Sequence, residues 1–170
     1  MSGTAPTERR SRLRQYQVQL LERMQAAKSG ATESGRELGV LIGGRPCLLD
    51  LTQISEIVPP QPVTPVPLTH DWYLGLANIR GHLTGVIDLA RYRQQAPGDA
   101  APSERRLITF APGLGFNCAL RVERVLGLRK LAGMEAVAGD EFRDGEGQSW
   151  LRLDLAQLVR EPRFVQVGLV

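Results

Sequence analysis

The chain has 170 residues, of which 42% are apolar and 23% are charged, a composition typical of a globular protein of one domain. Its formal net charge of +3 originates in residues 1–30, which carry six basic and two acidic groups, whereas the other 140 residues carry 15 basic and 16 acidic groups. A nearly neutral body with only 5% aromatic residues disfavours a nucleic-acid-binding protein, which needs basic and stacking side chains.

Neither a membrane span nor a secretory signal is indicated by the sequence. No apolar run approaches the roughly 18 residues that a membrane-spanning helix requires. Residues 1–30 lack the apolar core and the cleavage site of a signal peptide. We therefore expect a cytoplasmic protein with no direct membrane insertion.

Residues 7–28 are predicted to form an amphipathic helix. Leu13, Tyr16, Leu20 and Met24 recur at spacings of three and four, and basic and polar residues take the other faces. A flexible linker follows, up to residue 35. We expect the helix to pack on the body of the protein or on a partner, with an anionic membrane surface as the weaker alternative.

Residues 36–92 change to short strands separated by turn residues. "ELGVLIGGRPCLLDL" is typical of a hairpin, and "QISEIV" alternates as a strand with Ile54, Glu56 and Val58 on one face. "PPQPVTPVP" must be a loop or an edge strand, because proline cannot donate to a sheet. "LTHDWYLGL" suggests a short helical turn. Two strands joined at Gly81-His82 and a short helix from Asp88 complete this half.

The second half repeats the pattern after a polar connection at residues 93–104, which is long enough to cross between two sheets. Strands are predicted in "RRLITFA", "FNCALRVERVLGLRKL" and "QSWLRLDL". A helix is expected at residues 154–160, followed by a terminal strand or tail in "RFVQVGLV". Many short strands with helices only near the termini predict an all-β protein, built as two small barrels sharing a hydrophobic core.

No catalytic or metal-binding constellation is apparent. Cys47 and Cys118 lie in apolar runs, where small buried hydrophobes are expected. His70 and His82 fit loop positions, and no nucleophile has a base in a recognisable motif. The acidic "GDEFRDGEG" fails the spacing of a calcium loop and suggests a solvated loop. We expect no enzyme, no metal and no cofactor, which leaves a binding module.

"WYLGLANIRGHLTGVIDLARY" resembles the signature of CheW-like domains, the scaffold proteins of bacterial chemotaxis arrays. The matching residues are Trp72, Gly75, Asn78, Arg80, Gly81, Val86, Ile87, Asp88 and Leu89. Upstream, "LLDLTQISEIV" is similar to a second family signature, and "FNCALRVERVLGLRKL" is similar to a strand pair of the second barrel. The resemblance covers residues 36–158. Gly85 departs from the family pattern, which has proline there.

The resemblance implies two five-stranded barrels and an adaptor without catalysis. Its implied partners are the regulatory domain of a CheA-type histidine kinase and the cytoplasmic tip helices of a chemoreceptor, in arrays at the inner face of the membrane. The terminal segments look like the version in type IV pilus (twitching motility) signalling, called PilI-like. The implied organisation is a helix and linker at 1–35, a CheW-like domain at 36–161 and a strand or tail at 162–170.

The resemblance also implies a partner-binding surface. The matching positions are Ile54, Glu56, Ile57, Gly75, Arg80 and Gly81.

Each of these positions also has a structural explanation. Arg80 can pair with Glu56 or Asp88 and tie strands together, Ile54 can be core, and both glycines can serve turns. A small β-barrel that binds single-stranded nucleic acid is the alternative function.

Overall fold

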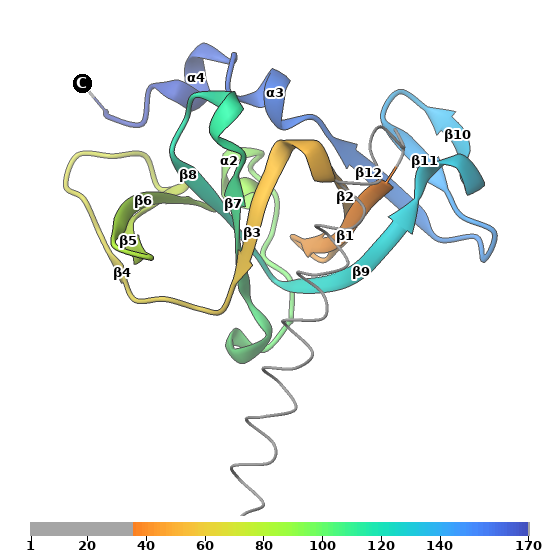
Figure 1. Ribbon diagram of the computed structural model, residues 1–170, viewed down its shortest axis with the longest axis horizontal. Coiled ribbons are helices and arrows are strands. Elements are labelled where there is room, and N and C mark those ends of the chain that lie inside the picture. Colours follow the sequence, from red (N-terminus) through yellow and green to blue (C-terminus); the bar gives the residue numbers. More distant parts are fainter. Residues whose placement is uncertain (1–35, 170) are drawn as a thin grey trace, which may run out of the picture. The chain divides into compact units, whose positions relative to one another are not determined.

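The computed structural model describes residues 36–169, which form two six-stranded sheets and a few short helices (Figure 1). The strands are β1 (Arg36–Ile42), β2 (Arg45–Asp50), β3 (Ile54–Val58), β4 (Val63–Thr64), β5 (Tyr73–Ile79), β6 (His82–Ile87), β7 (Arg106–Phe110), β8 (Cys118–Val122), β9 (Arg124–Lys130), β10 (Glu135–Ala138), β11 (Glu141–Arg143) and β12 (Ser149–Leu153). The α-helices are α2 (Leu89–Tyr92), α3 (Leu155–Leu158) and α4 (Pro162–Val165), and the 3-10 turns are η2 (Leu51–Gln53), η3 (Pro102–Glu104), η4 (Pro112–Leu114) and η5 (Leu131–Gly133). The predicted helix at 7–28 and its linker lie outside the described residues.

Sheet A has the strand order β10-β11-β12-β2-β1-β9. Its strands pair antiparallel except β12 and β2, which run parallel. The predicted first hairpin is confirmed, because Glu37 pairs with Asp50 at one end and Ile42 with Arg45 at the other. Its turn, Gly43-Gly44, has two positive φ angles of 59° and 72°, which glycine adopts without steric cost.

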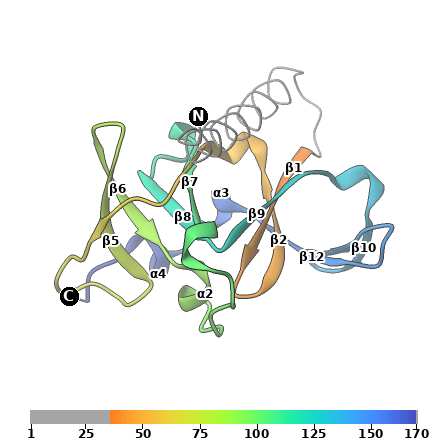
Figure 2. The same ribbon diagram turned by 90° about the horizontal axis from the view of Figure 1, so that it is seen from below.

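Sheet B has the order β3-β7-β8-β6-β5-β4, with only β6 and β8 parallel. The proline-rich stretch supplies β4 at the edge of this sheet, as predicted. Figure 2 shows β5 and β6 on one side of the domain and the sheet A strands β2, β12 and β10 on the other. The all-β fold class is therefore confirmed, with six strands in each sheet instead of the five that the resemblance implied.

The chain changes sheets at two short segments between β1 and β9. Residues 51–53 lead from β2 to β3, and the single residue Glu123 leads from β8 to β9. The connection at 93–104, which we expected to cross between the sheets, instead joins β6 to β7 within sheet B. A parallel pair such as β6 and β8 requires a long excursion of the chain, and this connection together with β7 provides it.

An aromatic cluster around Phe164 holds the C-terminal segment. Phe164 is fully buried, with ring centroids 5.7 Å from Trp72, 5.4 Å from Tyr92 and 6.3 Å from Phe110. Tyr92 donates a hydrogen bond from its hydroxyl to Glu161 at 2.7 Å. Burial and this hydrogen bond raise the pKa of Tyr92 to about 12. The α4 helix is thus anchored by both packing and polar contacts.

The structure refines two sequence expectations around this cluster. Of the two alternatives for residues 162–170, a strand or a tail, the strand is not formed within the described residues: residues 162–165 are helical, and Gly168 makes an isolated bridge to Thr69 with one backbone hydrogen bond on either side. The predicted helical turn in "LTHDWYLGL" is found only as a single hydrogen-bonded turn, in which the Tyr73 N–H donates to the His70 carbonyl at 3.1 Å, and β5 begins at Tyr73. Trp72 lies in this turn and is 3% exposed, with its ring stacked on that of Phe164.

The acidic segment contributes strands that the sequence pattern did not reveal. Glu141–Arg143 pairs with β12 on one side and with β10 on the other, where we expected a solvated loop. All four residues of β10 are exposed, so its sequence lacks the alternation of a half-buried strand. The short helices at Asp88 and Asp154 are confirmed, and each aspartate caps its helix by accepting a backbone N–H bond.

Within residues 36–169, no helix has both the length and the apolar character needed to cross a membrane.

Cys47 and Cys118 are predicted to resist thiol reagents in the folded protein. They are 3% and 1% exposed, and burial raises the pKa of Cys47 to about 11 and that of Cys118 further. A thiol titration at pH 8 should count no reactive cysteine in native protein and both in denaturant. Rapid native reaction at either thiol would contradict the packing.

Candidate partner-binding site

The hairpin between β5 and β6 ends in a tight turn that presents Arg80. Arg80 and Gly81 occupy the turn with φ angles of 52° and 81°, so the turn lies one residue earlier than the predicted Gly81-His82. Two positive φ angles are typical of a type I′ hairpin turn. Asn78 accepts a hydrogen bond from the Gly81 N–H at 2.9 Å, which fixes the tip. Gly81 therefore serves the turn itself.

Arg80 pairs with Glu56 on β3. The Arg80 Nε atom lies 2.7 Å from Glu56 Oε2, with 68% of the arginine side chain and 29% of the glutamate side chain exposed. Asp88, the other acid considered, instead caps α2 and pairs with Arg121 at 3.2 Å and Arg91 at 3.5 Å. The question of which acid Arg80 contacts is thus resolved in favour of Glu56.

The Glu56–Arg80 pair links two parts of sheet B that are far apart in its strand order. In the order of the sheet, β3 is separated from the β5–β6 hairpin by β7 and β8. A contact between these distant positions requires the sheet to curl. Because the arginine is largely exposed, the pair contributes no more than about 1 kcal/mol to stability. The pair holds the mostly exposed Arg80 at this edge of the sheet.

Glu56 sits in an irregular part of β3. The β3–β7 pairing changes register between Ile54 and Ile57, which leaves a bulge at Ser55 and Glu56. The Glu56 N–H donates to Thr109 Oγ1 at 2.8 Å. The bulge breaks the predicted alternation of this strand. Sequence reasoning missed Thr109, because a threonine in a strand carries no signal of such a contact.

The two isoleucines of β3 differ in accessibility. Ile54 is fully buried and pairs opposite Phe110, so its side chain belongs to the core. Ile57, at the far end of the bulge, is half-buried and reaches the surface in part. Of these two candidates, only Ile57 is placed to touch a partner directly.

Gly75 permits a close approach of β4 to β5. Its φ is 138°, and a Cβ at this position would lie 2.1 Å from the backbone oxygen of Thr64. Gly75 itself is buried. Because Gly75 has no side chain, β4 can lie close to β5. Gly75 therefore affects the partner-binding surface only indirectly.

Gly85, which stands where the family pattern has proline, also leaves room for a neighbouring side chain. A Cβ there would lie 2.7 Å from the hydroxyl of Tyr73. The Gly85 N–H also donates to the carbonyl of Asn117 at 3.3 Å, a bond that proline cannot make. The departure from the family pattern is thus accommodated by local contacts.

A shallow depression of about 410 Å³ lies along the outer face of β4, β5 and β6. It is lined by Gln61, Pro62, Thr64, Leu76, Asn78 and Leu83. Leu83 is 65% exposed and contributes apolar surface to this depression. Asn78 belongs both to the depression and to the Arg80 turn, so the apolar surface and the charged tip adjoin. Sequence reasoning did not single out Leu76 or Leu83.

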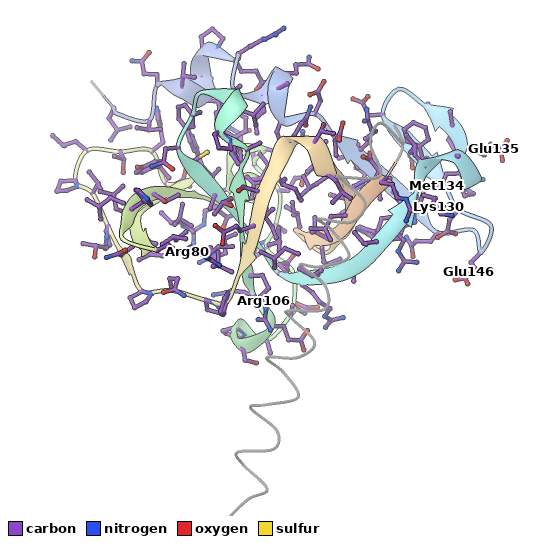
Figure 3. The ribbon with its side chains drawn as sticks, viewed as in Figure 1. Arg80, Arg106, Lys130, Met134, Glu135 and Glu146 are labelled. Atoms are coloured by element: carbon purple, nitrogen blue, oxygen red, sulfur yellow. The ribbon has the colours of Figure 1, made fainter. Side chains whose placement is uncertain are left out.

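Figure 3 shows Arg80 and Arg106 on sheet B, away from Lys130, Met134, Glu135 and Glu146 on the sheet A side. Among residues 36–169, no three His, Cys, Asp or Glu side chains form a group that could hold a metal ion. The arrangement offers an apolar surface bordered by a charged pair, which suits recognition of a protein partner.

A family model matches most of the chain, and a solved structure has a similar fold. A family model described as "CheW-like domain" matches residues 37–163. Among solved structures, the chain resembles the crystal structure of the scaffolding protein TtCheW from Thermoanaerobacter tengcongensis, with 18% sequence identity and a TM-score of 0.58. That match covers 71% of this chain and 89% of the other, and at this identity it shows the fold alone. No curated protein matches the sequence.

Gly75→Ala should destabilise the fold far more than Gly81→Ala. The first adds a methyl group against the Thr64 backbone and should cost about 3 kcal/mol or more in unfolding free energy. The second meets no atom within 4 Å and should cost about 1 kcal/mol, from the positive φ alone. Urea denaturation compares the two, and equal losses would contradict the close approach.

A double-mutant cycle with Glu56→Gln and Arg80→Gln should give a coupling of no more than about 1 kcal/mol in unfolding free energy. The coupling should shrink in 1 M salt, because Arg80 is mostly exposed. A coupling of several kcal/mol would instead identify the pair as a structural tie.

Proposed function

The chain belongs to the CheW-like domain family, and from this premise we propose that it is a non-catalytic adaptor in bacterial chemosensory signalling. It couples the cytoplasmic tip of a chemoreceptor to a CheA-type histidine kinase. The observation that carries the proposal is the exposed Arg80–Glu56 pair beside the apolar depression on β4, β5 and β6. Such a surface can hold a partner without any chemistry.

In this proposal the kinase and the receptor bind to different parts of this surface. The regulatory domain of the kinase docks against the β5–β6 side, where Leu83 supplies apolar contact and Arg80 with Gly81 fixes orientation. Receptor tip helices meet the β3 side, at Glu56 and Ile57. Ile54 and Gly75 are buried and contribute indirectly. Ile54 packs in the core and supports β3, and Gly75 permits β4 to lie close to β5.

The signalling system is proposed to be that of type IV pili, in a PilI-like role. Support comes from two segments that flank the CheW-like domain, the basic segment at 1–35 and the C-terminal segment at 162–170. In this role the protein works in the cytoplasm, at the inner face of the membrane, within receptor arrays.

The alternative of single-stranded nucleic acid binding gains no support. Stacking platforms require exposed aromatic rings on a strand face. Trp72, Tyr92, Phe110 and Phe164 are instead buried against one another.

The adaptor should co-elute with the regulatory domain of a CheA-type kinase in size-exclusion chromatography. Arg80→His should weaken this complex at least tenfold, because it removes the charge at the tip while the turn can persist. Receptor control of kinase activity in a reconstituted assay should fall in parallel.

Arg143→His is the matched control, since Arg143 is an exposed arginine on β11 of sheet A. It should bind as the unchanged protein does. The adaptor proposal fails if neither the kinase domain nor a receptor fragment is retained. The assignment of Arg80 fails if Arg80→His unfolds the protein or leaves binding intact.

A further inference from the structure

Thr109 lies where β3 and β7 lose their regular pairing. Ile54 is opposite Phe110 and Ile57 is opposite Ile108, so two residues of β3 face the single residue Thr109. This is the arrangement of a β-bulge, in which backbone groups of the bulged strand lose their partners in the sheet. On its other side, Thr109 continues the regular pairing of β7 with β8, opposite Ala119. The residue is therefore held firmly from β8 while it faces the bulge.

The Thr109 hydroxyl replaces the missing sheet partner of Glu56. Its Oγ1 accepts the Glu56 N–H at 2.8 Å and lies 3.4 Å from the Glu56 carbonyl oxygen, to which it can donate. A hydroxyl has one hydrogen and two lone pairs, so both contacts can form together. Thr109 is half-buried, where an unpaired N–H would be unfavourable. One side chain thus fixes both backbone polar groups of Glu56.

The carboxylate of Glu56 depends on this backbone support. Its Oε2 atom is buried and, within residues 36–169, accepts no hydrogen bond of good geometry, although Arg80 Nε lies 2.7 Å away. The Arg80 contact is therefore close but poorly aligned. A mostly exposed arginine cannot by itself fix the direction of the carboxylate, so the backbone of the bulge must do so.

We infer that Thr109 is a positioning residue for the partner-binding edge: its hydroxyl holds the β3 bulge in the form that directs Glu56 toward Arg80. Thr109 does not touch the partner. The effect on binding rests on the proposed function, whereas the effect on the geometry of Glu56 does not.

The inference is tested with Thr109→Val, which keeps the shape and removes the hydroxyl, and Thr109→Ser, which keeps the hydroxyl. Amide hydrogen exchange followed by NMR should show the Glu56 N–H exchanging at least tenfold faster in Thr109→Val, with protection restored in Thr109→Ser. The amides of the β6–β8 pairing should be unchanged. If Thr109→Val does not fold, Thr109→Ala, which also lacks the hydroxyl and relieves any crowding, takes its place.

Binding supplies the readout that a merely structural threonine would not affect. Affinity for the kinase regulatory domain should fall about tenfold in Thr109→Val and by less than threefold in Thr109→Ser. The loss should disappear in an Arg80→Gln background, because Thr109 acts through the Glu56–Arg80 pair. An equal loss in that background would overturn the inference, as would unchanged exchange at Glu56.

Failure of the two proposals can be distinguished. If the unchanged protein retains neither the kinase domain nor a receptor fragment, the proposed function fails, and the exchange rate at Glu56 still decides whether Thr109 holds the bulge. If the unchanged protein binds and Thr109→Val binds equally well, the inference alone fails.

Discussion

Sheet B bends far enough for its first strand to meet the hairpin between its fourth and fifth strands, and the candidate site depends on this bend. Glu56 on β3 and Arg80 at the β5–β6 tip lie 2.7 Å apart although β7 and β8 separate them in the sheet. Bulges and glycines allow a sheet to bend. Sheet B has register shifts in β3 and β5, and Gly75 and Gly85 leave room for a neighbouring backbone and ring.

The requirements of the fold do not explain why an arginine occupies the tip of the β5–β6 hairpin. A turn with two positive φ angles favours glycine or asparagine at both positions, yet Arg80 occupies the first with φ of 52°. An unfavourable backbone conformation in an exposed residue is a common sign of function. The ion pair with Glu56 is too exposed to account for it through stability. The proposed contact of Arg80 with a partner would account for both observations.

The sequence predicted the elements whose signals are local. The Gly43-Gly44 hairpin, the proline-rich edge strand and the helices capped by Asp88 and Asp154 all follow from turn, proline and capping chemistry. Elements decided by distant contacts were not predictable. Trp72 packs in a cluster with Phe164, from the far end of the chain, and no local sequence pattern signals that contact.

The same distinction applies to the candidate site. The motif around Arg80 could be recognised from the sequence, because its residues are consecutive. From the sequence, the ion-pair partner of Arg80 could be either of two acids, and the structure identifies it as Glu56. The depression beside Arg80 is formed by residues from three strands, which no consecutive motif reveals. The contact between Thr109 and Glu56 spans 53 residues and depends on a bulge, for which "QISEIV" gives no signal.

The most direct test of the account is an NMR titration of the isotopically labelled protein with an unlabelled CheA-type regulatory domain. We predict that the amide shifts that change will cluster at Arg80, Gly81 and Leu83, on the β5–β6 hairpin. Amides of β10 and β11 in sheet A should stay unchanged. Shifts confined to sheet A, or no shifts at saturating kinase domain, would contradict the claim that the Arg80 edge is where this adaptor meets the kinase.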